Sequence, residues 1–192
     1  MADILTDQQK KELLKLSRDT VTLYLNEKRI LECKITDPIL GEVMGVFVTL
    51  RKDNQLRGCI GNIIGIKPLY LGVIDMSIAS STQDPRFPAV TKKELPYIDI
   101  EISALSPLKE ITNPDEIVMG VHGVLVKDDY RSGVYLPQVA TETGWGRDEF
   151  MDSLCVHKAG MEASAWRTGV CQIYIFTAEV FSEHFFDDLT LL

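Results

Sequence analysis

Residues 42–61 read "EVMGVFVTLRKDNQLRGCIG" and decide how the first half of the chain folds. Apolar and β-branched residues fill positions 43–50, a polar segment follows, and an apolar segment returns from Leu56. Two β-rich runs joined by a short polar turn are typical of a hairpin. The stretch therefore predicts an antiparallel hairpin whose return strand carries Arg57 and Cys59 among glycines.

The other predicted elements of the first half are helices and one strand. A capping box at Thr6 and Gln9 precedes apolar residues at helical spacing, which predicts a helix over about 7–29. Pro68 is well placed to start a second helix that ends before the loop "QDPRFPAV", and Thr91 with Glu94 caps a short third helix. The alternating "YIDIEISAL" at 97–105 predicts a half-buried strand.

The second half repeats the mixture of hairpin, helix and strand. Residues 106–117 form a connector with two prolines, and 121–140 predict a second hairpin around "KDDYRSG". Residues 148–161 predict an amphipathic helix capped by Gly160, and 169–181 predict a last strand. Without regular β-α-β alternation, the pattern indicates an α+β fold. We expect one domain over 1–192, with antiparallel or mixed sheets flanked by helices and two lobes around a shared cleft, and no linker.

Composition and charge narrow the classes of function. The 192 residues include 20 Lys and Arg against 28 Asp and Glu, and the net charge of -8 disfavours nucleic-acid and anionic-membrane binding. No apolar run approaches the roughly 20 residues that span a bilayer, and no signal peptide is recognisable, which favours a cytoplasmic protein. The four cysteines are widely spaced, which predicts free thiols and no metal site or iron–sulfur cluster.

Four stretches in order carry a resemblance to a known family: "LRGCIG" at 56–61, "DPRFP" at 84–88, "EISALSP" at 101–107 and "LPQVATETGW" at 136–145. A "KAGM" segment followed by Trp166 completes the order. From about Gly45 to Phe181 the chain resembles an AMMECR-type domain, the A protein of the AmmeMemoRadiSam system. The resemblance implies a compact α+β domain with two unequal lobes, with "LRGCIG" lining the cleft, and association with a Memo-type protein and a radical-SAM protein.

The family motifs map onto particular positions of this sequence. They are Leu56 to Gly61, Asp84 to Pro88, Glu101, His122 with Gly123, Gln138, Glu142 and Trp145. The segment "LCVHKAG" holds one residue more than the family spacing, and an extra residue turns a helix face by about 100°. No role is therefore carried over to His157.

Cys59 is the sharpest candidate for chemistry. In an extended segment Arg57, Cys59 and Gly61 share one face, and Leu56, Gly58 and Ile60 share the other, which we expect to face the core. A nearby guanidinium can lower the pKa of a thiol and produce a thiolate nucleophile. The alternative is a buried cysteine that only fills space.

The arginines allow two interpretations. Arg57 and Arg86 could each bind a carboxylate or phosphate, with Gly58, Gly61 and Asp84 contributing to the same ligand site. Equally, Arg57 could form a structural ion pair with Glu101 or Asp84, and Arg86 could hold its loop to neighbouring carbonyl groups. We favour the structural role for Arg57.

Further candidates come from the rest of the motifs. His122 could act as a base toward a thiol, and Glu101 lies on the polar face of its predicted strand, where it could move protons. Gln138 and Glu142 follow the second hairpin and could orient a ligand or cap a helical turn. Each of these residue types is more often structural than catalytic.

Two functions follow from these candidates. The first is an enzyme that acts on a small or peptide-like substrate by group transfer or hydrolysis, with Cys59 as nucleophile, Arg57 holding an anionic group, and His122 or Glu101 moving protons. The second is a non-catalytic module that binds a ligand, a modified side chain or a partner's tail. The sequence contains no G-x-G-x-x-G or Walker motif, and we predict no cofactor or metal.

Overall fold

The computed structural model describes residues 5–184 and confirms the α+β class. The chain forms two compact units, each with its own four-stranded sheet. Of the described residues, unit 1 contains 5–105 and 179–184, and unit 2 contains Ser106–Ala178. Each of the two predicted hairpins belongs to a different unit.

The sheet of unit 1 is built on the predicted first hairpin. Strands β1 (Gly45–Lys52) and β2 (Gln55–Asn62) pair antiparallel, and β3 (Ile98–Leu105) and β8 (Ala178–Ser182) complete the order β2-β1-β3-β8. Asp53 and Asn54 form the turn with φ angles of 52° and 61°. Asp and Asn tolerate this left-handed conformation, which the right-handed twist of a two-residue hairpin requires.

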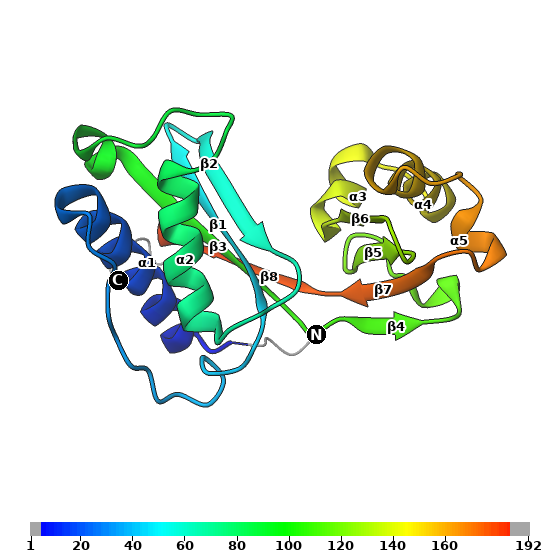
Figure 1. Cartoon of the computed structure of the whole chain (residues 1–192), viewed down its shortest axis with the longest axis horizontal. Coiled ribbons are helices and arrows are strands. Elements are labelled where there is room, and N and C mark those ends of the chain that lie inside the picture. Colours follow the sequence, from blue (N-terminus) through cyan, green and yellow to red (C-terminus); the bar gives the residue numbers. More distant parts are fainter. Residues whose placement is uncertain (1–4, 185–192) are drawn as a thin grey trace. The chain divides into compact units, whose positions relative to one another are not determined.

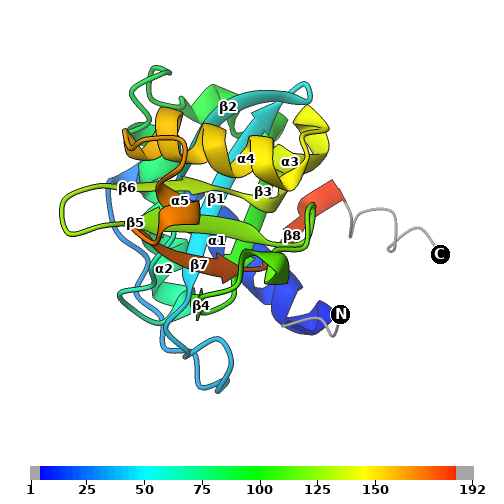
Figure 2. The same cartoon turned by 90° about the vertical axis from the view of Figure 1, so that its right-hand side faces the viewer.

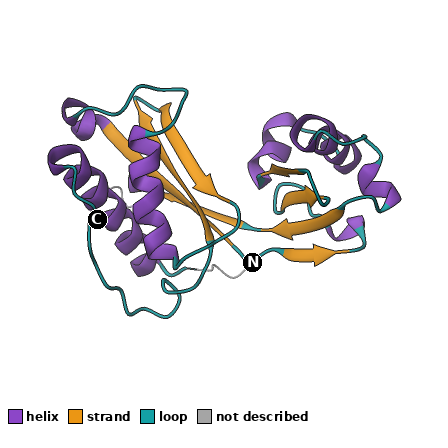
Figure 3. Ribbon diagram, in the orientation of Figure 1, coloured by secondary structure: helices purple, strands orange, loops and turns teal. Residues whose placement is uncertain are grey.

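Two helices cover one face of this sheet. Helices α1 (Asp7–Glu27) and α2 (Leu69–Thr82) lie side by side against the strands (Figures 1 and 3). The Thr6–Gln9 capping box is present, as predicted. The short helix between Thr91 and the third strand is the 3-10 helix η1 (Lys92–Tyr97), and its capping box is also present. Inward-facing strand residues fill the space beneath the helices, among them Val46, Val48, Leu50, Ile100 and Ile102.

The sheet of unit 2 has the order β4-β7-β5-β6 (Figure 2). Its strands are β4 (Lys109–Ile111), β5 (Gly123–Lys127), β6 (Ser132–Tyr135) and β7 (Gln172–Phe176). The helices are η2 (Pro114–Glu116), α3 (Pro137–Thr143), α4 (Arg147–Ser153), η3 (Leu154–Ala159) and α5 (Ala165–Thr168). Phe150, Met151 and Leu154 are fully buried in its core.

Three predicted elements differ in detail. The segment 106–117, which its two prolines indicated to be a connector, contains the short strand β4 and the turn η2. The predicted last strand is two strands, because the chain leaves one sheet after Phe176 and enters the other at Ala178. The helix over 148–161 ends at Gly160 with a φ of 64°, as predicted, but its second half is the π-helix η3. None of the helices within residues 5–184 is long and apolar enough to cross a membrane.

Gly58 is a test of how closely α2 packs on the hairpin. A Cβ atom at position 58 would lie 2.1 Å from the Ser80 carbonyl oxygen, which belongs to the backbone of α2. We predict that Gly58→Ala lowers the free energy of unfolding by roughly 2–4 kcal/mol, because the helix must move away from the sheet. Urea denaturation measures this change.

Gly146→Ala is the matched control for that substitution. Gly146 has no neighbour within 4 Å of an added Cβ, and its φ of -70° suits alanine. Equal stability of the Gly58→Ala and Gly146→Ala variants would contradict the tight contact between α2 and β2.

Candidate functional site

Cys59 lies on β2, the edge strand of the unit 1 sheet, in a row of polar side chains. The strand register pairs Cys59 with Thr49, and Thr49 with Glu101 on β3. Residues paired across neighbouring strands share a face, and Gly58 points to the opposite face against α2. The Thr49 hydroxyl donates a hydrogen bond to the Cys59 sulfur over 3.2 Å, and the cysteine is partly exposed. A thiol, a hydroxyl and a carboxylate therefore share the sheet face opposite α2.

The backbone of Cys59 is held from outside the sheet by the "DPRFP" loop. The Cys59 amide donates to Asp84 Oδ2 over 2.8 Å, and the Cys59 carbonyl accepts from Arg86 Nη2 over 3.2 Å. An antiparallel edge strand leaves such groups unpaired, and here a carboxylate and a guanidinium take the place of a neighbouring strand. The two motifs "LRGCIG" and "DPRFP" thus form one site.

Asp84 is the buried anchor of this arrangement. Its side chain is 2% exposed, and it accepts from Arg86 Nη2 over 2.7 Å, from Arg86 Nε over 3.0 Å and from the Arg86 amide over 3.1 Å. The Arg86 side chain holds the pKa of Asp84 far below its usual range, and the Cys59 amide adds to this effect, although burial opposes it. The carboxylate is therefore ionised at neutral pH, and both of its oxygens are occupied.

Arg57 has a different partner from the one that sequence reasoning considered. Its guanidinium donates to both oxygens of Glu94, over 3.0 and 3.3 Å, and to the Pro88 carbonyl over 2.8 Å. The proposed ion pairs with Glu101 or Asp84 were wrong. A bulge after Leu50 leaves Arg57 without a partner residue on β1, and the strand turns its side chain toward η1.

Glu94 is the residue that sequence reasoning missed at this site, although it was identified as a helix cap. Hydrogen bonds from Arg57 and from the Thr91 amide and hydroxyl lower the pKa of the Glu94 carboxyl group to about 2, although burial opposes this shift. Lys52 lies 3.6 Å away and adds positive charge. The capping box was the sequence signal, because it fixed where the Glu94 carboxylate lies.

The two glycines of "LRGCIG" have packing roles. Gly58 lets α2 approach, and a Cβ at Gly61 would lie 2.2 Å from the Phe47 ring on the neighbouring strand. The expected core position of Leu56 was wrong, since its side chain is 37% exposed. The same bulge is the physical reason, because it interrupts the alternation of faces before residue 58.

Glu101 takes part in a looser ion pair. Its carboxylate lies 3.5 Å from Arg51 Nη2, and its side chain is 23% exposed. The contact is longer than a hydrogen bond, so the carboxylate retains acceptor capacity on the Cys59 face of the sheet.

The remaining candidates belong to unit 2. His122 Nδ1 accepts from the Val118 amide over 3.1 Å and closes a turn, so its neutral ring carries the proton on Nε2. Gln138 lies in the first turn of α3 and has a buried Oε1 that accepts no hydrogen bond within the described chain, and Glu142 is exposed on the same helix. The contacts described for Cys59 all come from unit 1, and they include none of these three residues.

The four cysteines are free and lie in different environments. Cys33 is exposed, whereas Cys155 and Cys171 are buried in unit 2, where desolvation raises the pKa of both thiols, that of Cys155 to about 11. Within residues 5–184 no group of three or more His, Cys, Asp or Glu side chains is arranged to hold a metal ion. Cys59 is the cysteine that combines partial exposure with a hydrogen-bond donor at sulfur.

Comparison with known proteins identifies the family to which the chain belongs. The AMMECR1 family model matches residues 14–181, so the chain belongs to the AMMECR1 family. Protein MK0488 of Methanopyrus kandleri is 41% identical, with 95% of this chain and 92% of the relative covered. Protein PF1979 of Pyrococcus furiosus is 39% identical, covering 90% of this chain and 87% of the relative.

A solved structure supports the same assignment. The crystal structure of the uncharacterised protein PH0010 from Pyrococcus horikoshii matches with a TM-score of 0.83 and 38% identity, covering 94% of each chain. The match confirms the fold as well as the family.

The Arg57–Glu94 pair makes stability depend on acid pH. Because the pKa of Glu94 is about 2 in the folded protein, its ion pair stabilises the fold above the ordinary pKa of 4.5 and is lost as the pH falls through 2. We predict that Glu94→Gln costs roughly 1–3 kcal/mol at neutral pH and that this difference from the wild type shrinks toward about pH 2. Urea unfolding at several pH values measures it.

Glu162→Gln is the control for that series. Glu162 is exposed, and its carboxylate forms no ion pair within the described residues. A Glu94→Gln effect as small as that of Glu162→Gln at neutral pH would show that the pair adds nothing to stability.

Proposed function

We propose that this protein is a cysteine-dependent enzyme, a transferase or hydrolase that acts on a small or peptide-like substrate through Cys59. One observation carries the proposal: Asp84 binds the backbone amide of Cys59 and Arg86 binds its carbonyl group, while its partly exposed sulfur accepts a hydrogen bond from Thr49. A thiol whose backbone is fixed and whose sulfur is oriented by a hydrogen bond suits a nucleophile, because it is held in position to attack.

The other residues take supporting roles in this proposal. Asp84 and Arg86 position the nucleophile through its backbone. Arg57 positions the same strand by binding Glu94 and the Pro88 carbonyl. Glu101 shares the face of Cys59 and retains acceptor capacity, so it is the candidate proton carrier within unit 1.

The proposed reaction is acyl transfer through a thioester. The Cys59 thiolate attacks the carbonyl carbon of the substrate, the bond to the leaving group breaks, and the leaving group takes up a proton. Water or an amine then attacks the thioester, receives the acyl group and returns the thiol. Water as acceptor makes the enzyme a hydrolase, and an amine makes it a transferase.

A second candidate function is a binding module that works with Memo-type and radical-SAM partners. Its supporting observation is that β2 is an edge strand on which Leu56 is 37% exposed. Asp84 and Arg86 already bind the outward-facing backbone groups of Cys59, so a partner would contact the exposed side chain of Leu56 without pairing along this edge. If the protein is a binding module, Cys59 belongs to a recognition surface and forms no covalent intermediate. The free thiols support a proposed cytoplasmic location for either function.

An acyl-trapping experiment separates the two functions. We predict that p-nitrophenyl acetate acetylates Cys59 in the native protein, with a burst of nitrophenolate equal to the protein concentration. Peptide mass spectrometry locates the acetyl group, and added hydroxylamine should remove it from a thioester. Thr49→Val should slow the burst by roughly tenfold, because the sulfur loses its hydrogen-bond donor.

The control variants are Cys59→Ser, which should abolish the burst, and Cys33→Ser, which should leave it intact. An unchanged burst in Cys59→Ser, or acetylation of Cys59 only after unfolding, would contradict the proposed enzyme function and favour the binding function.

A further inference from the structure

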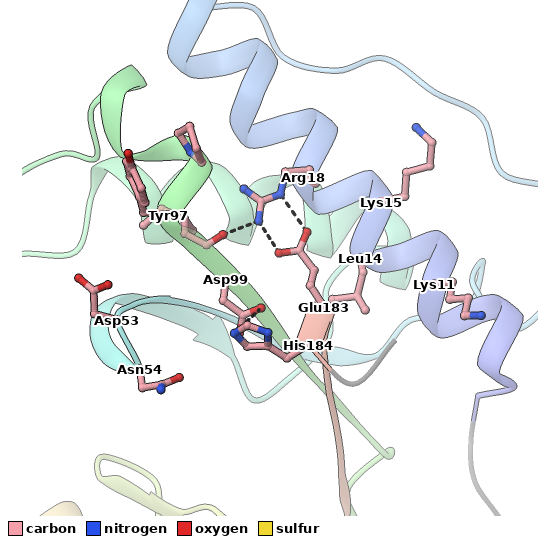
Figure 4. Close-up of a pocket in the computed structure, with 12 residues that line it drawn as sticks. Lys11, Leu14, Lys15, Arg18, Asp53, Asn54, Tyr97, Asp99, Glu183 and His184 are labelled. Carbon is pink, nitrogen blue, oxygen red and sulfur yellow. Dashed lines mark hydrogen bonds and ion pairs between the residues drawn. The ribbon is translucent and has the colours of Figure 1, made fainter. Parts of the chain in front are cut away.

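One cavity of unit 1 is lined by an arginine and a glutamate that bind each other (Figure 4). Arg18 on α1 binds both oxygens of Glu183, and it also donates to the carbonyl groups of Leu95 and Ile98, over 3.1 and 2.6 Å. These two side chains therefore hold the fold together and are not free to bind a ligand. A pocket of unit 2 differs, because some of its ionisable side chains have no partner among the described residues.

The pocket of unit 2 has a volume of about 550 Å³, which is within the range of small-molecule sites. It lies along one face of α4 and of η3, which continues that helix, and Trp145 before α4 adds to its lining. The two helical segments contribute Glu149, Asp152, Ser153, Val156 and His157. Helical spacing places these residues on one face. All of the lining residues belong to one compact unit.

Trp145 forms a fixed wall of this pocket. The centre of its ring lies 6.4 Å from that of Tyr135, whose ring lies 5.1 Å from that of the fully buried Phe150. The Tyr135 hydroxyl also shares a hydrogen bond of 3.0 Å with Ser153 Oγ. The indole ring and the serine hydroxyl are therefore held in place before any ligand binds.

The Asp152 carboxylate is already occupied. Its Oδ1 accepts from Trp166 Nε1 over 2.7 Å and from Arg167 Nη1 over 2.6 Å, and its Oδ2 accepts from Arg167 Nη2 over 3.4 Å. Arg167 thus compensates the charge of Asp152 from outside the pocket lining.

Glu149 and His157 have no such partners. Both are exposed, and neither forms a hydrogen bond or an ion pair within residues 5–184. The described part of the lining includes no lysine or arginine, so the Glu149 carboxylate is the uncompensated charge of the pocket. A carboxylate beside an indole ring suits a cation, which donates to the carboxylate and is attracted by the face of the ring.

We propose that this pocket binds a primary alkylammonium group, which is the chemistry of a lysine side chain and of a free aliphatic amine. The ammonium group lies between Glu149 and the face of the Trp145 ring, and the methylene groups pack on Val156, which is 42% exposed. A neutral alcohol would leave Glu149 uncompensated, and a carboxylate would be repelled by it. The site is independent of the chemistry proposed for Cys59.

NMR titration of the full-length protein with three small probes tests the site. Butylammonium carries the positive charge, 1-butanol has the same chain without charge, and butyrate carries the opposite charge. We predict that butylammonium shifts the indole N–H signal of Trp145 and binds at least about tenfold more tightly than either other probe. Glu149→Gln should weaken its binding about tenfold, and Trp145→Leu should weaken it roughly threefold.

A fourth probe, N-acetyl-lysine methylamide, distinguishes the two sources of the group. Binding tighter than that of butylammonium assigns the pocket to a lysine side chain of a partner, because the flanking amides then add contacts. Equal or weaker binding assigns it to a free amine.

The controls keep this result apart from nonspecific and folding effects. Glu162→Gln removes another exposed carboxylate of unit 2, outside the lining of this pocket, and should leave binding unchanged, as should Cys59→Ser. Glu149 is exposed, so Glu149→Gln reports on binding even where Trp145→Leu, which removes a ring packed on Tyr135, fails to fold. Absence of butylammonium binding, equal binding of 1-butanol or butyrate, or binding insensitive to Glu149→Gln would each overturn the proposal.

Discussion

The buried Asp84 carboxylate is the constraint on which the candidate site depends. It binds the Cys59 amide and the Arg86 side chain at once, and so joins an edge strand to a loop 25 residues further along the chain. An unpaired buried carboxylate would be costly, which makes Arg86 necessary to Asp84. Arg86 in turn reaches the Cys59 carbonyl, so the position of Cys59 is defined by backbone contacts. A thiol held in this way can be reactive without an arginine at its sulfur.

The sequence predicted the elements of the fold well where local signals were strong. Both hairpins, the capping boxes of α1 and η1, and the Gly160 helix end were confirmed because turn and cap residues act over a few positions. The division of 169–181 between two sheets had no such signal, because "QIYIFTAEVF" contains no Gly, Pro, Asn or Asp that would mark a turn, and only long-range pairing decides where the strand breaks. The π-helix at 154–159 was also not predicted, because its residues have ordinary helical spacing and nothing local marks the wider turn.

The site was predictable in part. The motifs "LRGCIG" and "DPRFP" meet in the structure, but the pairing of their side chains was not predictable. A single bulge after Leu50 redirected Arg57 to Glu94 and exposed Leu56, and bulges leave little trace in a sequence. Thr49 was not singled out because its role comes only from the strand register.

The most direct test of a positioned thiolate at Cys59 is the relative rate at which iodoacetamide alkylates the four cysteines of the native protein. The other three cysteines provide the comparison in the same sample. Cys33 is exposed, although partial desolvation of its thiol raises its pKa, and Cys155 and Cys171 are buried. We predict that Cys59 reacts fastest at neutral pH even though it is less exposed than Cys33, and that Thr49→Val removes this advantage. If Cys59 stays unmodified until denaturant unfolds the protein, the proposed role is contradicted, and "LRGCIG" has only a structural role on the edge strand β2.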